Sequence, residues 1–236
     1  MENKTNDIYG ELIGCDKMHY ALVKQDDAEK YEADKPVFLA PAAEVAHETA
    51  QNTVKRHYDN KPRFVTIVEG DTNVKITVSG VPCSLASKLT GKPYDAEKGL
   101  FYDTGSAEKT PWTALLGRME LGDGGYRYFN YLKGKFAIGS QVAHTREDNI
   151  TVHTVDLTYS AVVTEHEFQV DENTVSGVKG VFADTTDEKF TGAGTWFSAV
   201  QTPPEVQAAA AAAASADDSE PVDDGEPVDD GENTQE

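Results

Sequence analysis

The sequence lacks any long apolar run. No stretch approaches the roughly 18 apolar residues that a membrane-spanning helix needs. Its opening, Met1–Asp7, is wholly polar, so we expect neither a membrane span nor a signal peptide, and a protein that folds in a cytosol. It contains only two cysteines, Cys15 and Cys83. In a reducing compartment they predict buried free thiols rather than a structural disulfide.

Basic charge is scarce as well. The chain has 21 Lys and Arg against 41 Asp and Glu, a formal net charge of −20. Eleven of the acids and none of the bases lie between Glu205 and Glu236, so residues 1–204 carry 30 acids against 21 bases, a net charge of −9. Tight binding of nucleic acid requires clustered Lys and Arg that displace counterions, and no such cluster is present. An acidic domain would instead let an anionic polymer pass without binding it.

Motifs for catalysis are also missing. The sequence has no GxSxG turn, no phosphate-binding GxxxxGKS loop and no GxGxxG entering a helix. Asp103-Thr-Gly105 matches the aspartic protease triplet but lacks the hydrophobic strands that flank it there, and Glu165 and Glu167 point away from His166 on a strand. We therefore expect no catalytic, cofactor-binding or metal-binding residues and no enzymatic activity.

The six histidines carry the contrary hypothesis of a metal-dependent hydrolase. One polar stretch groups four side chains that are able to bind a metal: His144, Glu147, Asp148 and His153. Their spacing matches no helical HExxH pair, and such residues in a polar loop are ordinarily solvated. The hydrolase therefore remains a minor alternative.

Strand patterns dominate what is present. In Val74–Val78, apolar and polar residues alternate as in a half-buried strand. A second alternation over Val155–Val163 predicts five inward-facing side chains: Val155, Leu157, Tyr159, Ala161 and Val163. Between residues 112 and 138, Gly122–Gly125 predicts the turn of a β-hairpin. A single short helix is predicted from Pro82 to about Leu89, ended by Gly91.

The second strand of this hairpin is apolar on both faces. Strict alternation assigns one face to Tyr126, Tyr128, Leu132, Phe136 and Ile138, and the other to Arg127, Phe129, Tyr131, Lys133 and Lys135. Such a strand is central in a sandwich or buries its second face against another subunit, and we favour partial burial in a subunit interface. The candidate interface residues are Trp112, Arg127, Phe129 and Tyr131.

Three polar stretches are long for connections in a domain of this size: 26–36, 46–62 and 139–153. They are interpreted as lids, disordered excursions or arms that reach neighbouring molecules. Beyond one domain over residues 1–202, residues 203–216 predict an Ala-rich linker or short helix. Residues 217–236, with the repeat Glu-Pro-Val-Asp-Asp-Gly, predict a disordered acidic tail of unknown purpose.

Several short segments, in this order and spacing, resemble the phi13-type major tail proteins of long-tailed phages. They are Tyr9–Asp16, Val78–Pro82, Leu89–Asp95, Asp103–Gly105, Asp123–Tyr128 and Leu132–Phe136. The resemblance covers roughly residues 8–200. It implies a mostly β tail-tube fold, a β-sandwich or barrel with one short flanking helix and long loops.

The resemblance also implies a function. Subunits of that family form hexameric rings that stack into the hollow tube through which phage DNA is ejected. We therefore expect a structural virion protein, assembled in the cytoplasm of a bacterial host, whose partners are copies of itself and other tail proteins such as the tape measure and the tail terminator. DNA would pass without specific binding. The alternative is an Ig-like or carbohydrate-binding module with Trp112, Trp196 and tyrosines as an exposed sugar platform.

Overall fold

The computed structural model describes residues 10–106, 108–122, 124–141, 154–171 and 174–203. All of them belong to one compact unit, which ends at Pro203. The predicted linker and acidic tail lie almost entirely outside the described residues, as does the four-ligand group of residues 144–153.

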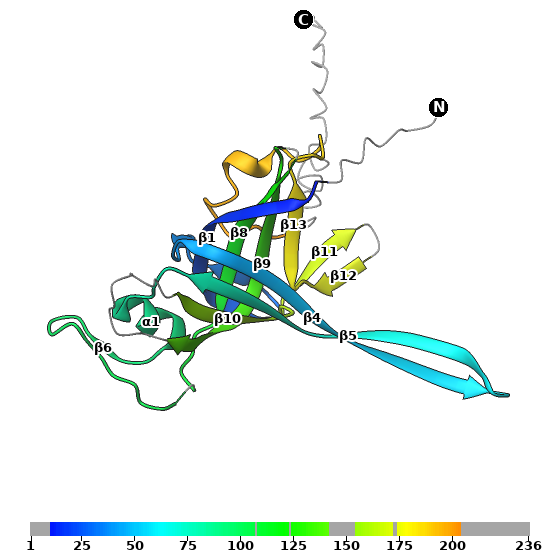
Figure 1. Cartoon of the computed structure of the whole chain (residues 1–236), viewed down its shortest axis with the longest axis horizontal. Helices are drawn as coiled ribbons and strands as arrows, with labels where there is room; N and C mark the ends of the chain where they lie inside the picture. Colours follow the sequence, from blue (N-terminus) through cyan, green and yellow to red (C-terminus); the bar gives the residue numbers. More distant parts are fainter. Residues whose placement is uncertain (1–9, 107, 123, 142–153, 172–173, 204–236) are drawn as a thin grey trace, which may run out of the picture. The chain divides into compact units, whose positions relative to one another are not determined.

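Most described residues form strands (Figure 1). In the first half of the chain these are β1 (Leu12–Asp26), β2 (Tyr31–Ala33), β3 (Val37–Phe38), β4 (Ala42–Tyr58), β5 (Lys61–Val78), β6 (Tyr94–Asp95) and β7 (Leu100–Phe101). The second half adds β8 (Thr113–Leu121), β9 (Tyr126–Gln141), β10 (Val155–Val162), β11 (Glu167–Asp171), β12 (Thr174–Gly177) and β13 (Gly180–Asp184). The described residues form one α-helix, α1 (Cys83–Thr90), and one 3-10 turn, η1 (Gly192–Gly194).

One large antiparallel sheet organises the domain. Its strand order is β2-β1-β8-β9-β10-β5-β4, with β13 paired to β9 and β3 paired to β1. Two small hairpins, β6–β7 and β11–β12, stand apart from it. The mostly β fold with one short helix is confirmed. Among the described residues, the end strands β2 and β4 do not pair, so the sheet does not close into a barrel.

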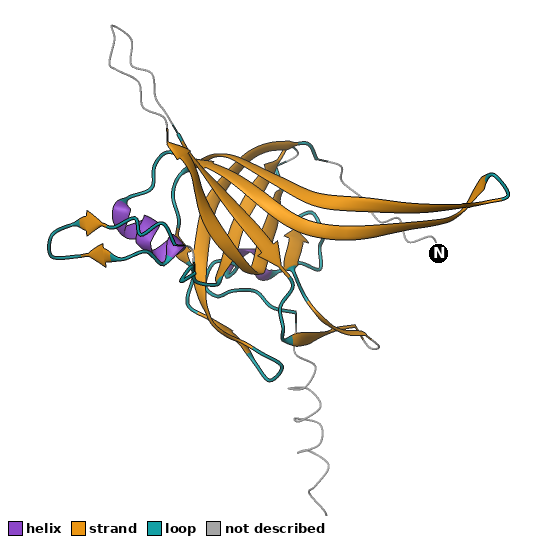
Figure 2. Ribbon diagram, turned by 90° about the horizontal axis from the view of Figure 1, so that it is seen from below, coloured by secondary structure: helices purple, strands orange, loops and turns teal. Residues whose placement is uncertain are grey.

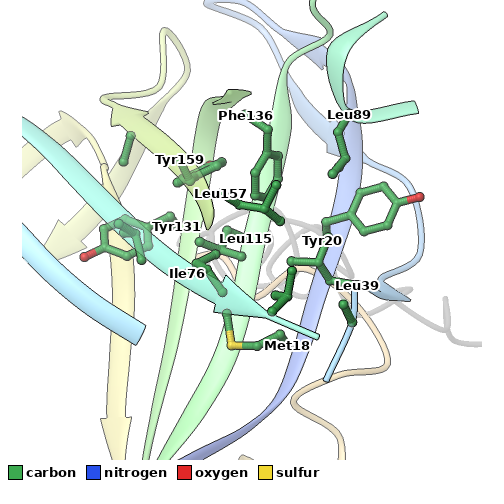
Figure 3. Packing of buried hydrophobic residues seen from close by; sticks show 14 of the residues in the cluster. Met18, Tyr20, Leu39, Ile76, Leu89, Leu115, Tyr131, Phe136, Leu157 and Tyr159 are labelled. Carbon is green, nitrogen blue, oxygen red and sulfur yellow. The ribbon is translucent and has the colours of Figure 1, made fainter. Parts of the chain in front are cut away.

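The main core covers one face of this sheet (Figure 3). Val74, Ile76 and Val78 of β5 and Leu157 and Tyr159 of β10 are fully buried, as the two alternations predict. Strand β10, however, ends at Val162, and the prediction for the next residue is wrong. Val163 lies beyond the ladder and is exposed.

The alternation predicted for β9 fails near its middle. Phe129 and Tyr131 lie in the same core cluster as Phe136, although an odd and an even position belong to opposite faces of a regular strand. The register of β8 against β9 shifts between the pairs Thr113↔Gly134 and Leu115↔Tyr131. This bulge inserts one extra residue into β9, and the side chains beyond it change face.

A second cluster covers the opposite face. It consists of Ala21, Ala114, Leu116, Tyr128 and Trp196. Residues 190–200, around η1, supply Trp196 and the partly buried Phe190 and Phe197 that pack against it. The chain itself therefore covers much of the second apolar face of β9.

Helix α1 follows its prediction closely. Pro82 precedes it, and Gly91 ends it in the left-handed conformation at φ +70°. Ala86 and Leu89 point into the protein, which leaves Cys83, the first residue, exposed. Cys15 is partly exposed, so both thiols are free as predicted, but the prediction that they are buried is wrong.

The described parts of the polar stretches contain strands as well as turns. Residues 46–62 form most of β4, the turn that follows it and the start of β5, while residues 26–36 contain the turn into β2. In that turn, Asp27 Oδ1 accepts hydrogen bonds from the backbone N–H groups of Glu29 and Lys30. Residues 139–141 continue β9, and the rest of the third stretch lies outside the described residues.

The bulge in β9 makes Gly134 intolerant of a side chain. A Cβ atom there would overlap the ring of Tyr159 and lie 2.5 Å from the backbone oxygen of Ser160. We expect Gly134→Ala to lower the free energy of unfolding by about 1–3 kcal/mol, measured by urea denaturation. Gly80→Ala is the control, because no atom lies within 4 Å of the added Cβ. Equal stability of the two variants would contradict this account of the bulge.

Candidate functional site

Strands β4 and β5 continue past the rest of the sheet as a two-stranded arm, residues 51–69. Figure 2 shows the two strands running on together beyond their neighbours. They pair from Gln51↔Glu69 to Tyr58↔Lys61. Strand β10 reaches only as far as Thr72 of β5, so within the described residues no strand pairs with the β5 edge of the arm.

Apolar side chains of the arm are exposed to solvent. They are Val54, Tyr58, Phe64, Val65, Ile67 and Val68, each 46–64% exposed. The segment from Phe64 to Val68 is exposed on both faces, because successive side chains of a strand point in opposite directions. An unpaired edge with apolar side chains on both faces is a template for another strand.

The arm also differs from the rest of the chain in charge. It carries four basic residues, Lys55, Arg56, Lys61 and Arg63, against the acids Asp59 and Glu69. Lys55 lies opposite Val65, and Arg56 lies opposite Phe64. Each strand thus carries two of the basic residues, and the uninterrupted apolar segment, Phe64–Val68, lies on β5.

The four predicted interface residues do not form one surface. Phe129 and Tyr131 are buried in the protomer core, because the bulge and strand β13 enclose them. Arg127 makes a two-pronged ion pair with Asp184 of β13, both contacts at 2.8 Å. Trp112 is 39% exposed, with Lys135 Nζ 4.4 Å from its ring centroid.

A hollow of about 620 Å³ opens between β4 and β13. Phe129, Tyr131 and Arg127 line it together with His47 and Phe182, so it brings three of the four predicted residues together as its wall. Its lining is largely apolar. Its polar groups form two pairs, His47 with Tyr131 and Arg127 with Asp184.

His47 is the one histidine in this wall. Its Nδ1 lies 2.9 Å from the hydroxyl of Tyr131, and its ring meets Phe129 edge-on at 4.7 Å between centroids. Burial lowers the pKa of His47 to about 4, and burial together with the nearby Glu69 raises the pKa of Tyr131 to about 12. At neutral pH both groups are uncharged, and they share one hydrogen bond whose donor is set by the tautomer of His47.

The most strongly buried ion pair of the described residues involves Lys133, in the middle of β9. Lys133 Nζ contacts Asp26 Oδ2 at 2.6 Å, and these side chains are 5% and 3% exposed. Glu165 Oε1 lies 2.9 Å from Lys133 Nζ, and the Asp26 carboxylate accepts the backbone N–H groups of Glu165 and His166. Burial opposes ionisation of Asp26, but the hydrogen bonds from Lys133 and the two N–H groups outweigh it and hold the pKa below its usual value.

Other residues that the sequence analysis considered for function make contacts typical of turns and of the core. Asp103 forms an ion pair with Lys92 and accepts the N–H of Gly105, as a turn residue does. Trp196 is 3% exposed, so it is not part of an exposed sugar platform as the carbohydrate alternative supposed. Within the described ranges, no three His, Cys, Asp or Glu side chains gather as metal ligands, and no helix is long and apolar enough to span a membrane.

Comparison with known proteins gave no relative: no family model matches the sequence, and no curated protein matches it.

An arm was one of the three interpretations of residues 46–62, but sequence reasoning missed that the arm is a pair of strands. The signal was the run Phe64–Val68, five residues rich in β-branched and aromatic side chains between Pro62 and Gly70. Its partner strand, residues 51–58, has no apolar periodicity and was assigned to a polar connection.

The buried pair gives a stability prediction. Lys133→Met would leave the Asp26 carboxylate buried without its cation, at a cost of about 3–5 kcal/mol in the free energy of unfolding. The control is Lys75→Met, which removes an exposed pair with Glu48 (3.4 Å; side chains 66% and 70% exposed) and should cost less than about 1 kcal/mol. Urea denaturation measures both. Similar decreases in the free energy of unfolding for the two variants would show that the buried Asp26–Lys133 pair stabilises the fold no more than an exposed pair does.

His47 gives a pH prediction. The unfolded chain protonates this histidine near its ordinary pKa of about 6.5, the folded chain only near 4. Between these values the unfolded state binds the extra proton, so stability falls as the pH falls, by up to about 3 kcal/mol. Denaturation of the wild type and of His47→Gln at pH 7 and pH 4.5 measures the difference, which isolates His47 from the carboxylates. Parallel pH dependences in the two proteins would refute the assignment.

Proposed function

We propose that this chain is a structural subunit that assembles with copies of itself through its arm. The observation that carries the proposal is the unpaired β5 edge, with exposed apolar side chains on both faces of Phe64–Val68. A monomer gains nothing from holding such a strand in water. A second strand paired along it would satisfy the backbone groups, and its side chains would contact the apolar side chains on both faces.

Electrostatics favours the same kind of contact. The chain has a net charge of −20, whereas the arm has more basic than acidic residues. Contact between the acidic surfaces of two copies is opposed by repulsion, but contact between the arm of one copy and the acidic body of another is attractive.

The resemblance to the phi13-type major tail proteins makes the proposal specific. The subunit would be the major tail tube protein of a long-tailed phage, located in the virion, forming stacked hexameric rings through which DNA is ejected. Tape measure and tail terminator proteins would be its further partners. The buried Trp196 weighs against the alternative of a carbohydrate-binding module.

The assembly test targets the apolar edge. Ile67, 64% exposed, faces solvent, so Ile67→Lys should leave the domain folded. Loss of one buried isoleucine in the interface costs about 1.5–3 kcal/mol, which raises the concentration needed for assembly at least about tenfold. Sedimentation velocity over a concentration series measures this shift, and electron microscopy shows whether the assemblies are rings or tubes.

The matched control is Val170→Lys, which changes an exposed apolar residue of β11, outside the arm. It should assemble like the wild type. A wild-type chain that stays monomeric at every concentration, even with tail initiator proteins, would overturn the proposed function. So would an Ile67→Lys variant that assembles normally.

A further inference from the structure

The arm leaves the sheet at a break in the β4–β5 ladder. Pairing runs regularly from Glu44↔Thr77 to Thr49↔Thr72, shifts register, and resumes at Gln51↔Glu69. Ala50, Gly70 and Asp71 fall in this break. Gly70 has no side chain, and a Cβ there would lie only 3.4 Å from Ala50. With no regular pairing at this point, the backbone ladder alone does not fix the direction of the arm.

One side chain bridges the break. Lys179, in the connection between β12 and β13, places its Nζ 3.0 Å from Thr72 Oγ1 on the sheet side. The same Nζ lies 3.4 Å from the backbone oxygen of Gly70 and 3.4 Å from Glu69 Oε1 on the arm side. These three acceptors therefore span the break from the sheet side to the arm side.

Lys179 is itself held by the rigid part of the domain. Its backbone oxygen accepts the N–H of Leu132, inside the bulge of β9, and the neighbouring Val178 oxygen accepts the N–H of Thr164. Thr72 is 2% exposed and lies 3.0 Å from the hydroxyl of Thr49, so the sheet side of the contact is also fixed. A continuous set of contacts thus joins the β9 bulge to the first residues of the arm.

We propose that Lys179 is a positioning residue that sets the direction in which the arm leaves the sheet. Its charge attracts Glu69 and its three N–H donors fit three oxygens arranged around the break. The arm is about 25 Å long at about 3.3 Å per residue, so a swing of about 20° at the break moves its tip by about 9 Å. Where the arm is an assembly surface, as proposed above, Lys179 would decide whether that surface meets its partner in register.

The test measures the arm direction in the monomer, so it does not depend on assembly. Spin labels are attached to Cys83, exposed on α1, and to position 57 of a His57→Cys, Cys15→Ser chain, below any assembly concentration. Pulsed dipolar spectroscopy then gives the distribution of distances between the labels. With Lys179 present we expect one narrow distribution. Lys179→Met should broaden it or shift it by several ångströms, up to about 9 Å.

Three further variants complete the test. Lys179→Arg should restore the narrow distribution, because it keeps the charge and several N–H donors. Thr72→Val removes the acceptor on the sheet side and should broaden the distribution as Lys179→Met does. Lys75→Met removes the Lys75–Glu48 pair, which joins the same two strands on the sheet side of the break, and should leave the distribution unchanged.

A narrow, unshifted distribution in both Lys179→Met and Thr72→Val would overturn the inference, and so would equal broadening in Lys75→Met. Failure of the wild type to assemble would refute the proposed function but leave these distances as a valid test of Lys179. Conversely, an unchanged distribution would refute the role of Lys179 while assembly through the β5 edge stands.

Discussion

Strand β9 imposes the constraint on which the rest of the domain depends. It pairs with β8 along one edge, and with β13 and then β10 along the other. To face the core both before and after the point where β13 gives way to β10, it needs one extra residue, and the bulge supplies it. The bulge places Phe129 and Phe136 in one core and turns Lys133 toward Asp26. Within it, the backbone N–H of Leu132 donates to the backbone oxygen of Lys179.

The sequence predicted those elements whose burial is local in origin. Two strand segments have one buried face and one face exposed to solvent, so the alternation of apolar and polar residues is enough to predict them: Val74–Val78 and Val155–Val162. The turn at Gly122–Gly125 and the end of α1 at Gly91 depend on backbone conformations that glycine adopts readily. Which side chains of β9 face the core beyond Tyr131 was not predictable from local alternation. The position of a bulge depends on which strands pair with the bulged one. One of these partners, β13, lies about 50 residues farther along the chain, so the local sequence of β9 does not reveal it.

The strand structure of the arm was not predicted, for a different physical reason. Hydrophobic periodicity records burial of one face, and both faces of residues 51–58 are in water. The burial of the interface candidates Phe129 and Tyr131 within the chain was not predictable either, since an aromatic strand that is apolar on both faces has the same pattern in a core and in an interface. Only the fold shows that β13 encloses them and that residues 190–200 cover the opposite face.

Exposure of the arm and the charge of the chain have to be considered together. A long, apolar and unpaired edge ordinarily leads to indiscriminate aggregation. Here Lys55 and Arg56 lie opposite Val65 and Phe64, and the surrounding chain is strongly acidic. Repulsion then suppresses every contact between like surfaces and spares the contact between an arm and a different, acidic part of another copy. A contact between two different surfaces is heterologous, and heterologous contacts either close into rings or continue as filaments. The tube of stacked rings proposed above would need contacts of this heterologous kind.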